Sequence, residues 1–215
     1  MSLRLANAYC VASANRSNDY GELLSNGAPN FPDGTPVALA LRAARVRGPS
    51  FFRAVLAVTA EREVKHYFVG STPEVLAALI ERLRDEHPRL SIAGWHSPPF
   101  APLDAPYLER IAAEVQARRP DIVWVGMGTP KQDFVADYIA RTTKIAAVGV
   151  GAAFDFVAGS VSEAPRWVQR SGIEWLYRLT QEPRRLWKRY FMGNAQFVFD
   201  LVRFRRDNLP AATPR

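Results

Sequence analysis

Two strand-to-loop transitions in the second half of the chain constrain its fold more than any other feature. The apolar run Ile122–Val125 ends in the loop Gly126–Gly128, and the apolar run Ile145–Val148 ends in Gly149–Gly151. About one helix's length separates the two runs, and strands that alternate with helices form parallel sheets. The carboxyl ends of parallel strands meet at one edge of the sheet, where such sheets bind ligands. We therefore expect a site built from the two glycine loops.

The same alternation extends toward the amino end. Lys65–Val69 is typical of a strand, and Pro73–Glu86 is typical of a helix for which Thr72 is a suitable N-cap. The fold class that we predict is α/β, with a Rossmann-like, mostly parallel sheet flanked by helices. The other expected elements are short strands at Ala8–Ala12 and Ser91–Ala93, and helices at Val37–Arg42, Ser50–Ala60, Tyr107–Arg118 and Gln132–Arg141.

The size and composition are those of a globular protein. The chain has 215 residues and a mass of 24.0 kDa, which suits one sizeable domain, and 48% hydrophobic with 23% charged residues argues against disorder. A single cysteine, Cys10, cannot form a disulfide framework, so we expect a reducing compartment. The amino end does not resemble a signal peptide, and no apolar run approaches the roughly 18 residues of a spanning helix. These features predict a cytoplasmic protein, soluble or peripheral to the membrane.

The net charge of +7 lies entirely in the tail. Residues 165–215 hold 11 Lys and Arg against 4 Asp and Glu, together with nine aromatic residues. Basic and aromatic side chains favour the headgroup layer of a membrane. They also suit nucleic acid, since phosphates attract arginine and bases stack on rings. We therefore divide the chain into an α/β core, residues 1–164, and a basic helical appendage, residues 165–215, with helices expected at Pro165–Ser171, Glu174–Thr180 and Pro183–Arg206.

Asp33 lies in a turn rich in glycine and proline, Pro32–Pro36, just before an expected helix. Such a turn fixes the direction of the carboxylate, which suits a general base that must reach a hydroxyl proton. A carboxylate at this position also caps helices. The pattern alone leaves both roles open.

The loop from Gly126 to Gln132 offers backbone N–H groups at the start of a helix. Unpaired N–H groups and the helix dipole make such a position attractive to anions, although the spacing is not that of a Walker A loop. The amide of Gln132 both donates and accepts hydrogen bonds, which suits a uracil edge or a sugar hydroxyl. The loop Gly149–Gly151 alone indicates only a tight turn.

The sequence lacks the motifs of several classes of functional site. There is no Asp-x-Asp, and His66, His87 and His96 are spaced by 21 and 9 residues, so we predict no metal site. No serine lies in a Gly-x-Ser-x-Gly elbow, and Cys10 has no motif around it. Gly149-x-Gly151 falls short of the dinucleotide fingerprint because the third glycine position holds Phe154. A diphosphate leaving group would then need protein cations, for which the tail offers Arg178, Arg184, Arg185, Lys188 and Arg189.

Taken together, these residues resemble the WecG/TagA/CpsF family of bacterial glycosyltransferases. The resemblance extends from about Val11 to Phe204. The matching motifs are Pro32-Asp33-Gly34-x-Pro36, Arg45-Val46-x-Gly48, Gly126-x-Gly128-x-Pro130-Lys131-Gln132-Asp133, Gly149-Val150-Gly151-Ala152-Ala153-Phe154-Asp155-Phe156-x-Ala158-Gly159, Ala164-Pro165-x-Trp167, Gly172-Ile173-Glu174-Trp175-x-x-Arg178-Leu179, Glu182-Pro183-x-Arg185-Leu186 and Arg189-Tyr190.

The resemblance implies an enzyme that moves a sugar from a UDP-sugar to a polyprenyl-diphosphate-linked saccharide during synthesis of surface polysaccharides. The reaction implied is an inverting, metal-independent displacement without a cofactor, at the cytoplasmic face of the membrane. UDP-glucose, UDP-N-acetylmannosamine and UDP-N-acetylmannosaminuronate all remain open as donors. The implied partners are the donor, the lipid-linked acceptor and an anionic membrane surface, and a homo-oligomer is left open.

The resemblance also assigns residues. It makes Asp33 the catalytic base. Ser13-x-Asn15 stands where the family has Thr-x-Asn, and the chain begins almost directly at this element, without the βα unit usual before it. The donor residues implied are Gly126, Gly128, Pro130, Lys131, Gln132, Gly149, Gly151, Phe154 and Asp155, and the acceptor or diphosphate residues implied are Ser13, Asn15, Arg45, Arg178, Arg185, Lys188 and Arg189.

The alternative is a nucleic-acid-binding module that uses the basic aromatic tail, consistent with a calculated pI of about 9.9. It leaves Asp33 and both glycine loops unexplained. We therefore prefer the transferase and expect no nucleic-acid partner.

Overall fold

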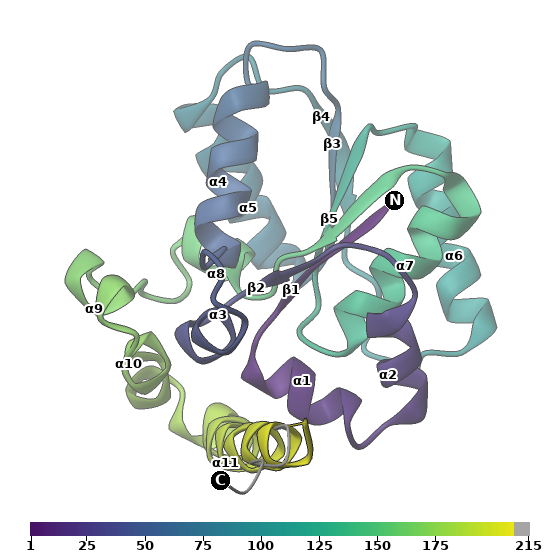
Figure 1. Cartoon of the computed structure of the whole chain (residues 1–215). Helices are drawn as coiled ribbons and strands as arrows, with labels where there is room; N and C mark the ends of the chain where they lie inside the picture. Colours follow the sequence, from purple (N-terminus) through teal and green to yellow (C-terminus); the bar gives the residue numbers. More distant parts are fainter. Residues whose placement is uncertain (209–215) are drawn as a thin grey trace, which may run out of the picture.

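A six-stranded sheet forms the centre of the computed structural model (Figure 1). The structure describes residues 1–208, without the side chains of Arg185, Lys188, Arg189, Met192, Arg205 and Asn208. The strand order is β2-β1-β6-β5-β3-β4, and every pairing is parallel, which confirms the predicted α/β fold class. The strands are β1 (Ser2–Ala6), β2 (Asn30–Pro32), β3 (His66–Gly70), β4 (Ile92–His96), β5 (Ile122–Gly126) and β6 (Ala146–Gly149).

Helices cover both faces of the sheet (Figure 1). On one face, α4 (Gly48–Thr59), α5 (Pro73–Glu86) and α8 (Ala153–Ala158) pack against Phe68 and Trp124. On the other face, α6 (Ala105–Arg118) and α7 (Lys131–Thr143) pack against Val123 and Val125. The central strands are therefore buried on both sides, which explains why they read as continuous apolar runs.

The amino-terminal segment corrects one prediction. Ala8–Ala12 was expected as a strand, but it lies in α1 (Ala8–Ala14), which is followed by α2 (Asn18–Ser25). The side chain of Asn7 accepts the backbone N–H groups of Tyr9 and Cys10, so it caps the helix and ends the preceding strand, β1. Neither β1 nor β2 was predicted, and β1 lies inside the sheet, between β2 and β6.

The later elements agree more closely with the sequence. α5 has the predicted bounds, and the Thr72 side chain accepts the N–H of Val75 as its N-cap. α3 (Thr35–Leu41) follows the Asp33 turn as expected. The predicted strand Ser91–Ala93 was too short, because β4 continues to His96 along the edge of the sheet.

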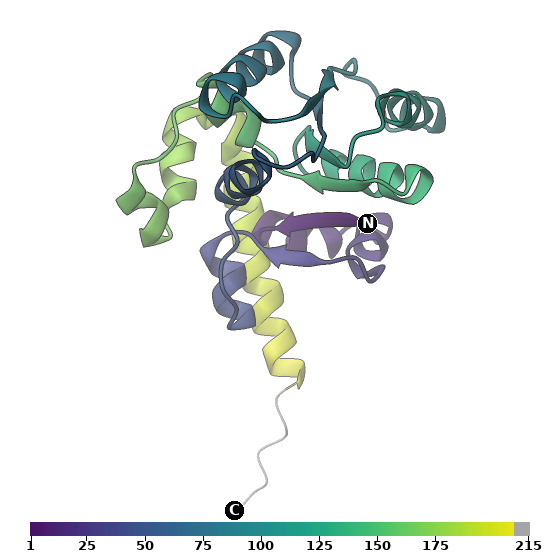
Figure 2. The same cartoon turned by 90° about the horizontal axis from the view of Figure 1, so that it is seen from above.

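Three helices follow the core: α9 (Arg166–Ser171), α10 (Glu174–Gln181) and α11 (Pro183–Asn208). α11 is long and lies alongside α3 and α1 (Figure 2). Its Phe197 is buried in one cluster with Ala8 and Val37, so this part of the tail packs on the core. The division at residue 165 stays a prediction. None of the helices within residues 1–208 is long and apolar enough to cross a membrane.

Candidate functional site

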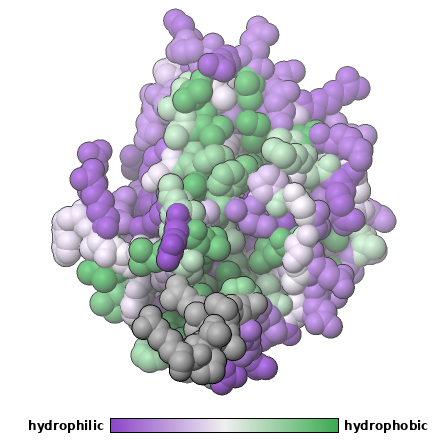
Figure 3. Space-filling model, in the orientation of Figure 1, coloured by the Kyte–Doolittle hydropathy of each residue, from purple (hydrophilic) through white to green (hydrophobic). Residues whose placement is uncertain are grey.

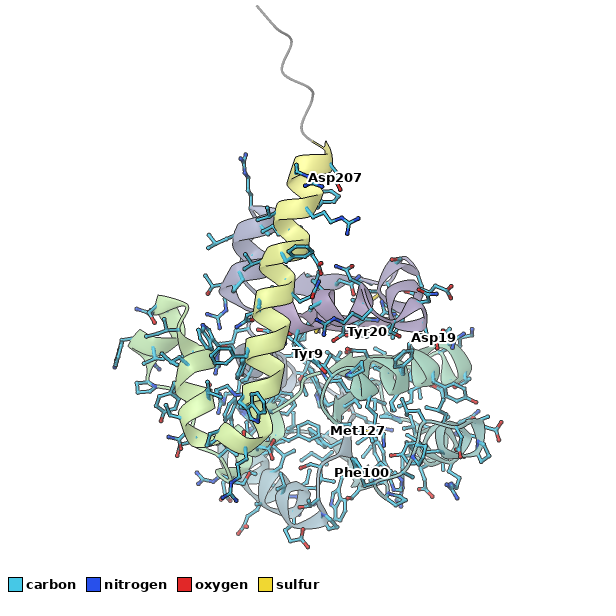
Figure 4. The ribbon with its side chains drawn as sticks, turned by 90° about the horizontal axis from the view of Figure 1, so that it is seen from below. Tyr9, Asp19, Tyr20, Phe100, Met127 and Asp207 are labelled. Atoms are coloured by element: carbon cyan, nitrogen blue, oxygen red, sulfur yellow. The ribbon has the colours of Figure 1, made fainter. Side chains whose placement is uncertain are left out.

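The carboxyl ends of the strands open into one cavity of about 770 Å³. The residues that follow five strands line it: Asn7 after β1, Asp33 after β2, Ser71 after β3, Gly126–Gly128 at β5 and Gly149–Gly151 at β6. In Figure 4, Tyr9 lies beside α11, whereas Met127 and Phe100 lie close together and farther from that helix; all three line the cavity. The cavity therefore lies at the edge of the sheet where the sequence predicts a site.

Asp33 lies at the end of β2, where its N–H donates to the carbonyl of Ala6 (2.8 Å). The following Gly34 adopts a φ of +94°, which only glycine accepts readily, and this turn directs the chain into α3. Gly34 is the N-cap of α3, and no side chain caps that helix. The capping role is therefore wrong for Asp33, and its carboxylate lies in the cavity wall.

The surroundings of Asp33 make it a plausible base near neutral pH. The pKa of its carboxyl group is raised to about 6, chiefly by burial and in smaller part by the charge of Glu174. The guanidinium groups of Arg45, Arg47 and Arg178 act in the opposite direction. A carboxylate with this pKa is ionised at neutral pH and still accepts a proton, as general-base catalysis requires.

Two of the arginines near Asp33 already have carboxylate partners. Glu174 binds Arg45 at 2.6 Å and Arg47 at 2.6 Å. Arg47 also pairs with Glu163 at 2.5 Å, and the same carboxylate binds Arg53 at 2.7 Å. This network joins the loop before α4 to α10 and to the segment before α9.

Arg178 differs from these arginines. Its guanidinium carbon lies 5.4 Å from the centroid of the Phe156 ring, and its Nε atom is buried without a hydrogen-bond partner. It pairs with no carboxylate in the described part of the chain, and it lines the cavity. Arg178 is therefore available to an anionic group of a ligand.

Gln132 joins the two glycine loops. Its side-chain oxygen accepts the backbone N–H of Gly128 at 3.1 Å and that of Gly151 at 3.0 Å. The sequence suggested that these N–H groups bind an anion, but Gln132 already occupies them. A Cβ atom at Gly149 would lie 3.1 Å from Gln132, so the glycine allows the side chain to cross the loop. Gln132 is only 3% exposed, and the bonds to its oxygen fix its orientation at the cavity wall.

Other residues that were predicted to bind the UDP-sugar support the two glycine loops. Lys131 Nζ donates to the carbonyl of Ala101 (2.7 Å) and lies 4.5 Å from the Tyr107 ring centroid, which holds the loop after β4 against the cavity. Phe154 is fully buried and packs behind Gly126, which lines the cavity; a Cβ atom at Gly126 would come within 2.5 Å of the Phe154 ring. Pro130 is the N-cap of α7, and Asp155 lines the cavity.

Only some of the residues that were predicted to bind the acceptor or the diphosphate line the cavity. Arg45 and Arg178 line the cavity. Ser13 and Asn15 do not; Asn15 is exposed and donates to Asp200 on α11 at 2.7 Å. Their acceptor role and that of Arg185, Lys188 and Arg189, whose side chains lie outside the described part, stay predictions.

Several cavity residues were not predicted from the sequence. Asn7 and Tyr9 were missed because β1 was not recognised, although a short alternating apolar run followed by Asn was a signal for both the strand end and the helix cap. Glu174 and Trp175 were quoted only as parts of a motif. The other cavity residues without a predicted role include Arg47, Phe156, Tyr190 and Asn194. Within residues 1–208, no group of three His, Cys, Asp or Glu side chains is placed to hold a metal ion.

Comparisons with known proteins identify the family of this chain. The model of the Glycosyl transferase WecG/TagA/CpsF family matches residues 2–210. A Bacillus subtilis (strain 168) protein named N-acetylglucosaminyldiphosphoundecaprenol N-acetyl-beta-D-mannosaminyltransferase is 30% identical over 186 residues, which cover 82% of this chain and 70% of the relative. A protein of the same name from Bacillus spizizenii (strain W23) is 30% identical over 180 residues, which cover 79% of this chain and 66% of the relative.

Proposed function

Because the chain belongs to the WecG/TagA/CpsF family of glycosyl transferases, we propose that it moves a sugar from a UDP-sugar to a saccharide linked to polyprenyl diphosphate. The two relatives are named for transfer of N-acetylmannosamine to N-acetylglucosaminyldiphosphoundecaprenol, which makes UDP-N-acetylmannosamine the first donor to test. The matched segments span about two thirds of those relatives, so the substrates of this chain are part of the proposal.

The observation that carries the proposal is the pairing of two groups in one cavity. Asp33 is a half-buried carboxylate with a pKa of about 6, and Arg178 is a guanidinium without a carboxylate partner among the described residues. A base and a free cation are what a displacement of diphosphate by a hydroxyl requires. A nucleic-acid-binding module would need neither.

The mechanism follows from these roles. Asp33 takes the proton of the acceptor hydroxyl as its oxygen attacks C1 of the donor sugar from the face opposite UDP. The bond from C1 to the phosphate oxygen breaks, and its electron pair leaves with UDP, whose developing charge Arg178 stabilises. The configuration at C1 is inverted, and the proton remains on Asp33 until it passes to solvent. Gln132 holds the two glycine loops in place around the donor.

The test is a panel of UDP-sugars incubated with a short lipid-diphosphate-linked N-acetylglucosamine. We expect UDP release that requires both substrates and persists in EDTA, since Arg178 carries the leaving-group charge in this mechanism. UDP-glucose and UDP-N-acetylmannosaminuronate are the comparison donors. Absence of UDP release with every donor would contradict the proposed function, and activity that needs Mg²⁺ or Mn²⁺ after EDTA treatment would contradict its metal independence.

We also propose that the tail docks on an anionic membrane, because the acceptor is lipid-linked. Trp167 on α9 and Phe191 on α11 are each 69% exposed, and further apolar side chains reach the surface on the face shown in Figure 3. Exposed aromatic residues on basic helices favour the headgroup layer. This placement would put the protein on the inner face of the membrane as a peripheral enzyme.

A further inference from the structure

We propose that Glu174 is a positioning residue that sets the charge around Asp33, because it pairs with Arg45 and Arg47 and so leaves Arg178 as the cation for the leaving group. This inference rests on the proposed function. It assigns a role to a carboxylate in the cavity wall that does not itself react.

The geometry of Glu174 is that of a charge partner for two arginines at once. Its Oε2 atom lies 2.6 Å from Arg45 Nη2, and its Oε1 atom lies 2.6 Å from Arg47 Nη2 and 2.9 Å from Arg47 Nε. Arg47 Nε also donates to Oε2 at 3.0 Å, so the Arg47 pairing is bidentate, which is the strongest arrangement for a guanidinium and a carboxylate. Only 13% of the Glu174 side chain and 8% of the Arg47 side chain are exposed, so water screens the pairing weakly.

If Glu174 did not pair with them, Arg45 and Arg47 would lower the pKa of Asp33 further. Arg45, Arg47, Arg178 and Glu174 are the charged groups that influence Asp33. Without the Glu174 charge, Arg45 would lose its carboxylate partner, and Arg47 would keep only Glu163, so more positive charge would act on Asp33. A carboxylate surrounded by cations holds its negative charge tightly and accepts a proton poorly. Glu174 therefore preserves the basicity that burial gives to Asp33.

The position of Glu174 on α10 also matters for the leaving group. Glu174 lies in the first turn of this helix, and Arg178 follows four residues later, so both lie on the same face. Both line the cavity. The ion pairs of Glu174 hold that helical face over the cavity, which brings Arg178 to the ligand while Arg45 and Arg47 remain neutralised.

The chain offers a matched control in Glu163. This carboxylate pairs with the same Arg47, and with Arg53, but it does not line the cavity. Glu163→Gln removes one negative charge from the same network without removing one that faces Asp33. Any effect that Glu174→Gln shows and Glu163→Gln does not is therefore due to the charge beside the base.

The experiment is a titration of the Asp33 carboxyl by NMR in ¹³C-labelled protein, with the signal assigned by its loss in Asp33→Asn. We expect a midpoint near pH 6 in the wild type and in Glu163→Gln. In Glu174→Gln the midpoint should fall by about one pH unit or more, since a like charge has been removed. Arg45→Gln should shift it in the opposite direction, and the double variant should return toward the wild type.

These opposite signs keep the test decisive even if Glu174→Gln does not fold. A midpoint unchanged in Glu174→Gln, or in Arg45→Gln if that variant alone folds, would overturn the inference.

Binding and turnover separate this role from simple support of the fold. Glu174→Gln releases Arg45 and leaves Arg47 with Glu163 alone, so UDP should bind several-fold more tightly. Turnover should fall by about tenfold, as expected for a weaker base. Loss of support alone would weaken both, and that result would overturn the inference. The titration does not depend on catalysis. If no UDP-sugar is turned over but the midpoint shifts, the proposed function fails and the charge role holds; if sugar is transferred without a shift, only the charge role fails.

Discussion

The side-chain oxygen of Gln132 accepts the backbone N–H of Gly151 at 3.0 Å, which ties α7 to the loop after β6. The same oxygen accepts the N–H of Gly128, so one amide joins both glycine loops. With its oxygen engaged twice, Gln132 has only its NH₂ group left for a ligand, and no partner for that nitrogen is found within the described residues. We therefore expect Gln132 to act on a ligand as a hydrogen-bond donor.

Two substitutions at Gln132 separate the donor from the loop contacts. In Gln132→Glu the carboxylate still accepts both N–H groups but cannot donate, so we expect a folded protein whose affinity for UDP falls by about tenfold or more. In Gln132→Met both functions are lost, and the melting temperature should fall as well. Calorimetric titration with UDP and thermal unfolding measure the two effects. Wild-type affinity in both variants would show that the amide does not contact the nucleotide.

Arg178→Ala should lower turnover by about 10²- to 10³-fold, because it removes the cavity guanidinium that stabilises the leaving group in the proposed mechanism. The effect should persist with a water-soluble acceptor, where membrane docking is not required. Arg184→Ala is the matched control, since Arg184 is exposed on α11 and does not line the cavity. Equal turnover in the two variants with the soluble acceptor would exclude a catalytic role for Arg178.

The buried His66 gives the stability of the fold a pH dependence. Its Nδ1 accepts the indole N–H of Trp124 (3.0 Å), and its Nε2 lies 2.9 Å from the hydroxyl of Thr59, which itself donates to the carbonyl of Val55. The ring is therefore neutral with its proton on Nε2, and burial lowers the pKa of His66 to about 4.

We expect this part of the stability to be present above about pH 6.5, where the histidine of the unfolded chain is also neutral, and to be lost as the pH falls toward 4. The unfolded state binds the proton first, so the free energy of unfolding should fall by about 2 kcal/mol between about pH 7 and 4.5. Urea unfolding of the wild type and of His66→Gln at both pH values measures this change in the free energy of unfolding. The inference fails if the variant loses as much stability on acidification as the wild type.

Membrane docking predicts that the double substitution Trp167→Ser and Phe191→Ser weakens binding to anionic vesicles by about tenfold or more, because two exposed aromatic anchors are lost. Val58→Ser is the control, since Val58 is 62% exposed but lies on α4. Cosedimentation with vesicles at low and high salt measures binding. Turnover of a water-soluble acceptor should not change. Unaltered binding by the double variant would remove these residues from the docking surface.

The sequence predicted the elements that are buried on both sides or clearly capped. α5 was placed correctly because Thr72 and Pro73 mark its start and leucines mark its buried face. β1 was missed because Arg4 interrupts its apolar pattern. In the structure, Arg4 Nη2 pairs with Asp137 on α7 (2.9 Å), a contact between residues distant in sequence. The same error turned α1 into a strand.

The site shows the same limit. The turn that holds Asp33 and the two glycine loops could be predicted, since turn chemistry and strand ends are local features, but only the family resemblance assigned Asp33 its role. The partners of the arginines could not, because Arg45 and Arg47 meet Glu174 only when α10 folds back over the sheet edge. Nor could the pattern show that Gln132 occupies the N–H groups of both loops, because that contact depends on the packing of α7 against β6.

The central claim is that Asp33 is the base in transfer of a sugar from UDP, and the most direct measurement is the rate of UDP release by Asp33→Asn with both substrates present. We expect turnover to fall by about 10²- to 10⁴-fold while UDP binding stays at the wild-type level, because the amide cannot take the acceptor proton. In the wild type, activity should decline as the pH falls through about 6, where Asp33 becomes protonated. Wild-type turnover in Asp33→Asn would contradict the account.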